Sequence, residues 1–274
     1  MNIFYNYFDS KEKPNYVKLR VANIFGFMET GKTVLTRKIA SRLEEICEKK
    51  SWGFLYIEGR SQHDVLEYIR NNRDEIKSLD YVVLGYDDAG RFFLSRESMT
   101  KERRNVIKDY MEIRHFFEEI GFKRGIVTIL FNIQFYSLLE KTIRNSPLSI
   151  WKSLVVMDIN EKKNLMMRLG LKYYYFLKII TKAMFIENYR LTLNEIRTRR
   201  GRQEIYDFLV SFFKRYNVDA ESYLNGEFVK RFAVVELLGT KFIIDSGNDI
   251  SVPKNFVKIE SKSSSQPRRK RKSA

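Results

Sequence analysis

Five apolar runs of strand length alternate with amphipathic segments through the first 158 residues. In the amphipathic segments, apolar residues recur every three or four positions, as they do along one face of an α-helix. Strands that alternate with helices of this length form right-handed βαβ units. The pattern therefore predicts an α/β fold in which a mostly parallel sheet lies between two helical layers. The five runs are Val17–Ile24, Gly53–Ile57, Tyr81–Leu84, Gly125–Asn132 and Leu154–Met157.

Helix signals fill the gaps between these runs. Ser61, with Asp64 three residues later, resembles a capping box at the start of the second helix. Further helices are predicted at residues 101–119 and 135–143, and the residues through Asn15 are expected to form a loosely held arm. The helix after the first run has a clear apolar face, which consists of Leu35, Ile39, Leu43 and Ile46.

From about residue 160 the pattern changes, and long helical segments dominate. They are followed by a predicted β-hairpin and then by a serine-rich and basic stretch that has the composition of a disordered tail. The sequence thus predicts three parts: a core at residues 1–159, a helical C-terminal region with a terminal hairpin at 160–260, and a disordered basic tail at 261–274. The helical segments are Lys172–Glu187 and Arg202–Arg215, and the hairpin strands are Phe242–Asp245 and Ile250–Lys258.

Composition places the chain among folded proteins of a reducing compartment. Hydrophobic residues make up 44% of the 274 positions, which is enough for a sizeable core. Cys47 is the single cysteine, so no disulfide framework is expected. The first residues lack a secretory signal, and no apolar stretch has the length of a membrane span. We expect a cytoplasmic protein, in the host cytoplasm if a virus or plasmid encodes it.

Charge points to an anionic partner. The formal net charge is +16, and six basic residues lie between Lys262 and Lys272 with no acid among them. Such an excess favours nucleic acid over a membrane surface. The alternative is a surface whose charge only keeps the protein in solution.

The first apolar run leads into a glycine-containing loop, Gly26–Thr33, with the sequence Gly-Phe-Met-Glu-Thr-Gly-Lys-Thr. Two glycines with four residues between them, followed by Lys and Thr, form the P-loop (Walker A) pattern. The backbone of Gly26, Phe27, Met28, Glu29, Thr30 and Gly31 would cradle phosphates at the start of the next helix. Lys32 would reach the β- and γ-phosphates, and Thr33 would bind Mg²⁺. The loop predicts binding of ATP with Mg²⁺, whereas the alternative is a glycine-rich turn without a ligand.

An acid pair, Asp87-Asp88, follows the third apolar run. A carboxylate at the tip of a strand beside a P-loop can hold the Mg²⁺ shell, and we assign this role to Asp87. Asp88 is then the candidate that polarises the attacking water. The alternative for both acids is a solvated turn.

Two further polar residues follow the fourth run. Gln134, at its tip, would face the γ-phosphate, although a capping or loop glutamine is nearly as good an explanation. Arg144 would act as a finger in a neighbouring subunit's site, and its alternative is a surface arginine. Arg114 and His115, on the preceding helix, are weaker candidates for reading the phosphate.

The order of these motifs resembles the additional-strand, RecA-like class of P-loop ATPases. Within it, Asp87-Asp88-Ala89, Arg114-His115, Gln134 and Arg144 resemble the HerA/FtsK superfamily over residues 17–158. That superfamily includes DNA-pumping translocases, viral genome-packaging ATPases, conjugation coupling proteins and Zot-like proteins. The resemblance implies a hexameric ring that threads double-stranded DNA with ATP. The family usually has Asp-Glu where this chain has Asp-Asp, and Glu29 is unusual within a P-loop.

Other readings of the sequence stay open. A nucleotide-gated DNA-binding replication or partition factor would share the P-loop and the charge, and a P-loop phosphotransferase would share only the loop. In the C-terminal region, the basic turn Arg197–Arg202 is a candidate DNA-backbone contact or an exposed helix connection. The aromatic run Tyr173–Phe176 could stack bases, but core packing explains it better. The helices and hairpin would also suit a winged-helix module.

Overall fold

The computed structural model describes residues 2–87, 89, 112–134, 146–154, 159–182, 186–198, 202–216, 230–247 and 249–260. The helices are α1 (Asn2–Phe8), α2 (Lys32–Lys49), α3 (Gln62–Asn71), α4 (Arg73–Ile76), α6 (Ile113–Glu119), α8 (Ile159–Lys182), α9 (Ile186–Thr198) and α10 (Gln203–Arg215). The strands are β1 (Val17–Phe25), β2 (Phe54–Gly59), β3 (Tyr81–Tyr86), β4 (Gly125–Ile133), β5 (Leu148–Trp151), β6 (Phe232–Leu237), β7 (Thr240–Asp245) and β8 (Phe256–Ile259).

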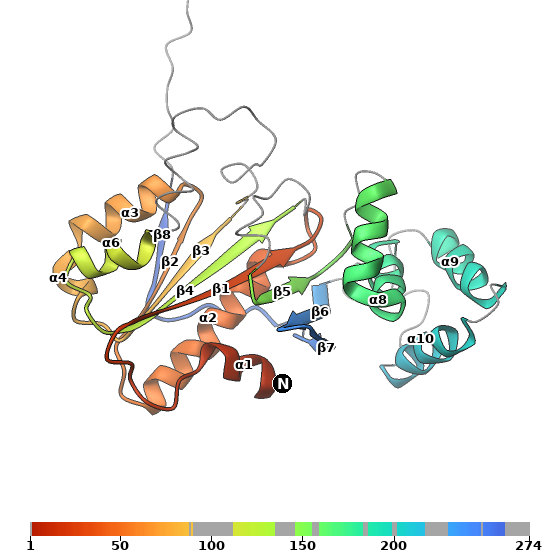
Figure 1. The fold of residues 1–274 in the computed structure, drawn as a ribbon, viewed down its shortest axis with the longest axis horizontal. Coiled ribbons are helices and arrows are strands. Elements are labelled where there is room, and N and C mark those ends of the chain that lie inside the picture. The colour runs from red at the N-terminus through yellow and green to blue at the C-terminus, as the bar shows by residue number, and fades with distance from the viewer. Residues whose placement is uncertain are drawn as a thin grey trace, which may run out of the picture.

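All eight of these strands form one sheet, in the order β7-β6-β5-β1-β4-β3-β2-β8 (Figure 1). The six neighbouring strands β5-β1-β4-β3-β2-β8 are all parallel to one another. Strand β6 runs antiparallel to both β5 and β7. The predicted α/β fold with a mostly parallel sheet is confirmed. Strand β4 lies between β1 and β3, so one additional strand separates the strand before the P-loop from the strand before Asp87.

Two helical layers cover the sheet, because successive side chains of a strand point to opposite faces. In β3, Val82, Leu84 and Tyr86 pack on the face covered by α3, α6 and α8, whereas Tyr81 and Val83 pack on the face covered by α1 and α2. Strands β1 and β4 alternate in the same way. The apolar runs that form β2, β3 and β4 are therefore strands buried on both faces.

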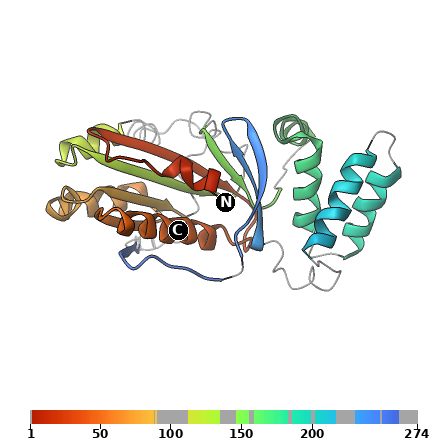
Figure 2. The same cartoon turned by 90° about the horizontal axis from the view of Figure 1, so that it is seen from below.

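The helices α8, α9 and α10 form a unit beside the β5–β6 side of the sheet, where Figure 2 shows them stacked together. We call this the helical unit. Helix α8 bends at Gly170, where φ is 75° and ψ is 157°. The prediction that the aromatic run belongs to a core is confirmed, since Tyr174, Tyr175 and Phe176 are buried. None of the helices among the described residues is both long enough and apolar enough to cross a membrane.

The strand observed after Pro147 is Leu148–Trp151, which was not predicted, and most of the predicted fifth strand, Leu154–Met157, lies outside the described residues. Two other local predictions are wrong. The terminal hairpin is β6–β7, with its turn at Leu238–Gly239, and it extends the main sheet instead of forming a winged helix. The first residues are not a loose arm, since Phe4 and Phe8 of α1 are buried against α2. The predicted helix 135–143, most of the predicted helix 101–119 and the tail 261–274 lie outside the described residues.

Residues 249–255, here called the strap, carry the chain from β7 along α2 to β8 at the opposite edge of the sheet (Figure 2). The strap contacts one side of α2 along its length. The carboxylate of Glu44, buried on α2, accepts hydrogen bonds from the backbone N–H groups of Lys254 (2.7 Å) and Asn255 (2.8 Å) and from the Asn255 side chain (2.9 Å). The strap therefore replaces residues 250–255 of the hairpin strand predicted for Ile250–Lys258, and the rest of that segment lies in β8, which pairs with β2.

We expect Glu44→Ala to lower the free energy of unfolding by about 2–3 kcal/mol, because it removes the buried, charged acceptor of three hydrogen bonds from the strap. Glu45→Ala is the matched control, since the neighbouring Glu45 pairs with Arg42 at the surface and should contribute less than about 1 kcal/mol. Urea denaturation monitored by circular dichroism measures both variants. Equal effects of the two substitutions would contradict a structural role for the strap.

Candidate nucleotide-binding site

The loop Gly26–Gly31 joins the carboxyl end of β1 to α2, as predicted for a P-loop. The Gly26 N–H donates to the carbonyl of Ile133 (3.1 Å) at the end of β4. A Cβ atom on Gly26 would lie 2.7 Å from Thr30 Oγ1 and 3.0 Å from Lys152 Cβ, so a side chain does not fit there. Gly31 precedes α2 with φ of 79°, a left-handed conformation that glycine adopts without strain. Both glycines of the motif are thus required by the shape of the loop.

The side chains of the loop separate into two groups. Phe27, Met28 and Glu29 are exposed, so the unusual carboxylate of Glu29 is not packed inside the loop. Thr30 Oγ1 donates to the Phe27 carbonyl (2.9 Å), and this bond closes the turn. Lys32 Nζ donates to the carbonyls of Gly26 (2.8 Å) and Phe27 (2.6 Å), which places its ammonium group directly over the loop.

Thr33 and Asp87 are brought together by the fold although 54 positions separate them in the sequence. Thr33 lies in the first turn of α2, and Asp87 follows β3. Thr33 Oγ1 donates to Asp87 Oδ1 over 3.2 Å, and the Asp87 N–H donates to the Gly59 carbonyl (3.1 Å) at the end of β2. A hydroxyl beside a carboxylate at the carboxyl edge of the sheet is a set of oxygen donors that suits Mg²⁺.

The remaining predicted site residues are only partly described. Gln134 is half-buried directly after β4, next to the strand that leads into the loop. Asp88 and Arg144 lie outside the described residues. Arg114 and His115 are exposed on α6, where both bond Glu118 (3.0 Å and 3.2 Å), so their contacts favour the surface alternative.

A charged network that the sequence did not predict lies beside this pair of oxygen donors. Arg37 on α2 donates two hydrogen bonds to Glu58 at the end of β2 (2.8 Å and 2.7 Å), and Tyr56 also donates to Glu58 (2.9 Å). The hydrogen bonds to Glu58 raise the pKa of Arg37, and the nearby charge of Asp87 adds to this shift. The network fixes the first turns of α2 to the sheet and brings a permanent positive charge near Asp87.

Lys152 and Ser153, which follow β5, lie directly behind the loop and were also missed. Ser153 Oγ accepts a hydrogen bond from the Phe27 N–H (2.7 Å). Lys152 is fully buried, and its ammonium donates to the carbonyl of Lys230. Burial lowers the pKa of Lys152 to about 7, helped by the positive charge of Lys38 and opposed by Asp245. Nothing in the sequence marks a buried lysine, because lysine is almost always exposed.

Comparisons with known proteins give no match to a family model or to a curated protein. Among solved structures, the chain is similar to the genome-packaging NTPase B204 of Sulfolobus turreted icosahedral virus 2, with 10% identity and a TM-score of 0.42 over 82% of this chain and 97% of that one. It is also similar to the pCW3 conjugation coupling protein TcpA, with 8% identity and a TM-score of 0.39 over 86% and 61% of the two chains. RuvB of Thermotoga maritima gives 18% identity and a TM-score of 0.30 over 74% and 64%.

The chain's own geometry decides the fold. Strand β1 leads into the P-loop and helix α2. Across the sheet, the additional strand β4 separates β1 from β3, and Asp87 follows the tip of β3. The protein has the fold of a P-loop NTPase. In such a fold, phosphates lie at the loop and at the N-terminus of the helix after it. Lys32, Thr33 and Asp87 stand at that position here, so the residues present fit a nucleotide with Mg²⁺.

Proposed function

We propose that this P-loop NTPase hydrolyses ATP and uses the energy to move DNA, in the manner of HerA/FtsK-type translocases and packaging motors. The observation that carries the proposal is the contact between Thr33 and Asp87 beside the loop. It supplies both protein ligands that the metal of a nucleotide needs, one from the helix and one from the strand tip. A viral or plasmid source and a hexameric ring belong to the same proposal.

In this proposal each described residue of the loop binds or orients the nucleotide. The N–H groups at the start of α2 and the Lys32 ammonium bind phosphate oxygens, for which Lys32 exchanges its bonds to the Gly26 and Phe27 carbonyls. Thr33 and Asp87 would hold Mg²⁺. When bound, the metal would neutralise charge that develops on the phosphate oxygens.

Hydrolysis needs a water to attack the γ-phosphorus as the bond to the leaving ADP oxygen breaks. We assign acceptance of the water's proton to Asp88 and its orientation to Gln134, and we assign stabilisation of the transferring phosphoryl group to Arg144 of a neighbouring subunit. The positions of Asp88 and Arg144 lie outside the described residues, so their roles rest on the order of motifs in the sequence. Asp88 has a shorter side chain than the usual glutamate, which favours slow turnover.

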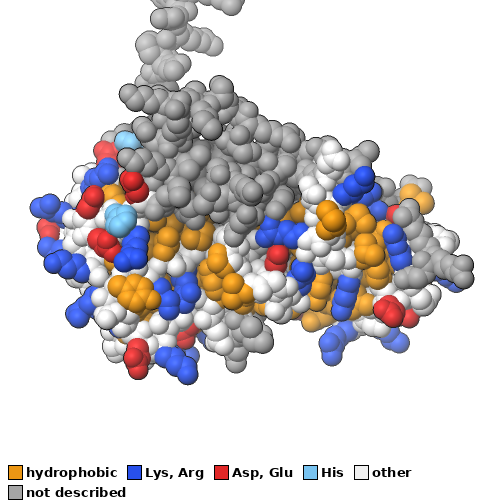
Figure 3. All heavy atoms as spheres, viewed as in Figure 1, with side chains coloured by type: hydrophobic (Ala, Val, Ile, Leu, Met, Phe, Trp, Pro, Cys, Tyr) orange, Lys and Arg blue, Asp and Glu red, His pale blue; other side chains and the backbone are white. Residues whose placement is uncertain are grey.

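Positive charge supports DNA as the partner. On the face shown in Figure 3, the described Lys and Arg side chains are spread over both the sheet region and the helical unit instead of forming one patch. The basic segment from Lys262 to Lys272 follows β8, which runs parallel to β2. Ile259 of β8 is paired with Gly59, whose carbonyl accepts from Asp87. Strand β8, the last described strand before this segment, therefore ends at the carboxyl edge of the sheet, on the same side as the nucleotide site.

ATP turnover with and without double-stranded DNA tests this function. We expect DNA to raise kcat severalfold, with a stimulation that declines steeply as salt increases because phosphate contacts release counterions. Lys32→Ala should lack turnover in both conditions. The matched control is Lys49→Ala, which removes an exposed lysine from the far end of α2 and should leave turnover unchanged.

The other functions predict different results. A nucleotide-gated DNA-binding factor would show slow turnover without stimulation, together with DNA affinity that depends on nucleotide. It would also be a monomer or dimer by light scattering, whereas a motor forms a ring. A phosphotransferase would transfer phosphate to a small acceptor and would not respond to DNA. Turnover that Lys32→Ala does not abolish would refute the proposed site itself.

A further inference from the structure

Residues that precede and follow the helical unit in the sequence contact the P-loop. The unit is inserted between β5 and β6, and residues 152–154 lead into it while Lys230 lies between it and β6. At the entry, Ser153 Oγ accepts from the Phe27 N–H over 2.7 Å. At the exit, Lys230 lies against Gly31. A Cβ atom placed on Gly31 would be 3.6 Å from the Cα atom of Lys230. The Lys152 ammonium joins the two ends by its bond to the Lys230 carbonyl.

The three residues after β5 bind three different parts of the molecule. The Lys152 N–H donates to the Phe25 carbonyl (2.7 Å) at the end of β1, and Ser153 binds the loop. The Leu154 N–H donates to Thr181 Oγ1 (2.7 Å) on α8, and Thr181 in turn donates to the carbonyl of Leu177 (2.7 Å). Two adjacent residues, Ser153 and Leu154, therefore connect the loop to the last turns of α8, one by a hydrogen bond to each.

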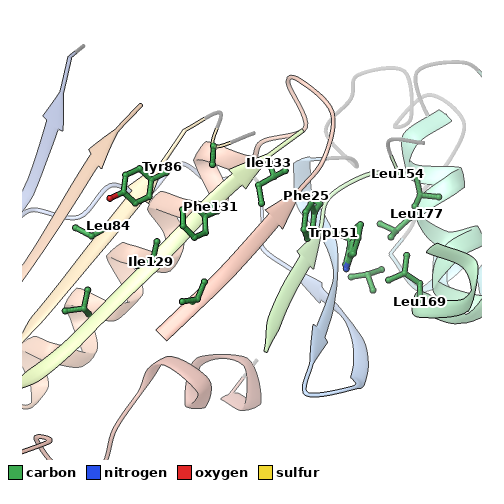
Figure 4. Close-up of a cluster of buried hydrophobic side chains, with 14 of the residues drawn as sticks. Phe25, Leu84, Tyr86, Ile129, Phe131, Ile133, Trp151, Leu154, Leu169 and Leu177 are labelled. Atoms are coloured by element: carbon green, nitrogen blue, oxygen red, sulfur yellow. The ribbon is translucent and has the colours of Figure 1, made fainter. Parts of the chain in front are cut away.

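Packing reinforces this connection. Phe25, which precedes the loop, stacks on Trp151 with a distance of 4.4 Å between ring centroids, and the Arg168 guanidinium of α8 lies over the Trp151 ring at 5.7 Å from its centroid. Figure 4 shows Trp151 beside Phe25, and Leu154 beside Leu177 of α8. Ser153 is 1% exposed. A buried hydroxyl with one backbone partner in the loop holds that peptide in a fixed orientation.

We propose that Ser153 is a positioning residue for the P-loop and that, through it, the helical unit responds to the nucleotide bound there. This inference rests on the proposed binding of ATP. Ser153 orients the Gly26–Phe27 peptide, and Lys32 donates to the carbonyl of this peptide and to that of the next one. When phosphate replaces these carbonyls as the partner of Lys32, the peptide shifts, and Ser153 and Leu154 transmit the shift to α8.

Ser153→Ala tests the proposal, with Ser149→Ala as the matched control. Ser149 is equally buried on β5, but its hydroxyl accepts from Arg168 of α8 (3.2 Å) instead of from the loop. We expect Ser153→Ala to raise the KM for ATP about fivefold with little change in kcat, as the loss of one hydrogen bond in the binding site predicts. Ser149→Ala should keep the parental KM, and matching unfolding midpoints would show that both variants are folded.

Hydrogen–deuterium exchange with a non-hydrolysable ATP analogue and Mg²⁺ measures the transmission. In the parent, we expect the analogue to slow exchange at the start of α2 and to change it in residues 172–182 of α8. In Ser153→Ala at saturating analogue, the change in α2 should persist and the change in α8 should disappear.

Four results would overturn the proposal. An α8 response that survives in Ser153→Ala, or an unchanged KM, would remove Ser153 from the connection. A parent in which α2 responds and α8 does not would show that nucleotide binds without any signal to the helical unit. If neither helix responds in the parent, the proposed nucleotide binding fails together with this inference.

Discussion

Replacing Asp87 by asparagine is expected to raise the Mg²⁺ concentration needed for half-maximal ATP hydrolysis by about 10- to 100-fold. Asparagine retains a side-chain oxygen that accepts from Thr33, so the 3.2 Å contact and the local fold can persist. Only the negative charge is lost. Because that charge is what attracts a hard divalent cation, the variant isolates the metal-binding role of Asp87 from its structural one.

Steady-state hydrolysis measured over a range of Mg²⁺ concentrations at fixed ATP checks this result. Excess Mg²⁺ should restore much of the lost rate if the weakened step is metal binding. Asp74→Asn is the matched control, because Asp74 is an exposed acid on α4 that pairs with Lys77. A parental Mg²⁺ dependence in Asp87→Asn would show that Asp87 does not hold the metal.

The parts of the site that the sequence predicted depend on short-range signals. The spacing of Gly26, Gly31, Lys32 and Thr33 is local, and it specifies the shape of the loop almost by itself. Placing Asp87 beside Thr33 required one further inference, that parallel strands bring their carboxyl ends to one edge of a sheet. The structure brings the two residues to 3.2 Å, while their roles in binding and hydrolysis remain predictions.

The parts that were missed depend on long-range pairing. Ser246-Gly247-Asn248 has the composition of a hairpin turn, whereas the observed turn at Leu238–Gly239 combines an exposed leucine with a glycine, both with positive φ. Leucine is rare in that conformation, so composition favoured the wrong turn. The strap and β8 pair with α2 and β2 across about 200 positions of sequence, and no local pattern specifies such a partner.

The polar residues behind the loop were missed for another reason. Asn132 is 2% exposed and accepts from Thr36 of α2 (2.7 Å), but in the sequence it is only the last residue of an apolar run. Lys152 follows a strand, where a lysine is ordinarily expected to reach solvent. In both cases the burial comes from segments that are distant in the sequence, and those segments also supply the hydrogen-bond partners.

Lys152→Met is expected to stabilise the protein most strongly at low pH. Burial lowers the pKa of Lys152 from 10.5 to about 7. Below pH 7 the lysine is protonated in both the folded and the unfolded chain, so the cost of a buried ammonium is fully present. Between pH 7 and pH 10.5 the folded chain has lost this proton while the unfolded chain keeps it, and the parent becomes more stable as pH rises. Methionine has no proton to lose, so the advantage of the variant should shrink by about 2–3 kcal/mol between pH 6 and pH 9.

Urea unfolding of parent and variant at pH 6, 7.5 and 9 measures this difference, because other titrating groups affect both proteins alike. The variant also removes the donor to the Lys230 carbonyl, which costs about 1 kcal/mol at every pH and does not change the slope. Lys49→Met removes an exposed lysine of α2 and should show no comparable pH dependence. A difference between parent and Lys152→Met that stays constant with pH would mean that Lys152 keeps an ordinary pKa and that the ammonium is stabilised by its partners. The buried position would then serve to fix Lys230 against the loop without any destabilising charge.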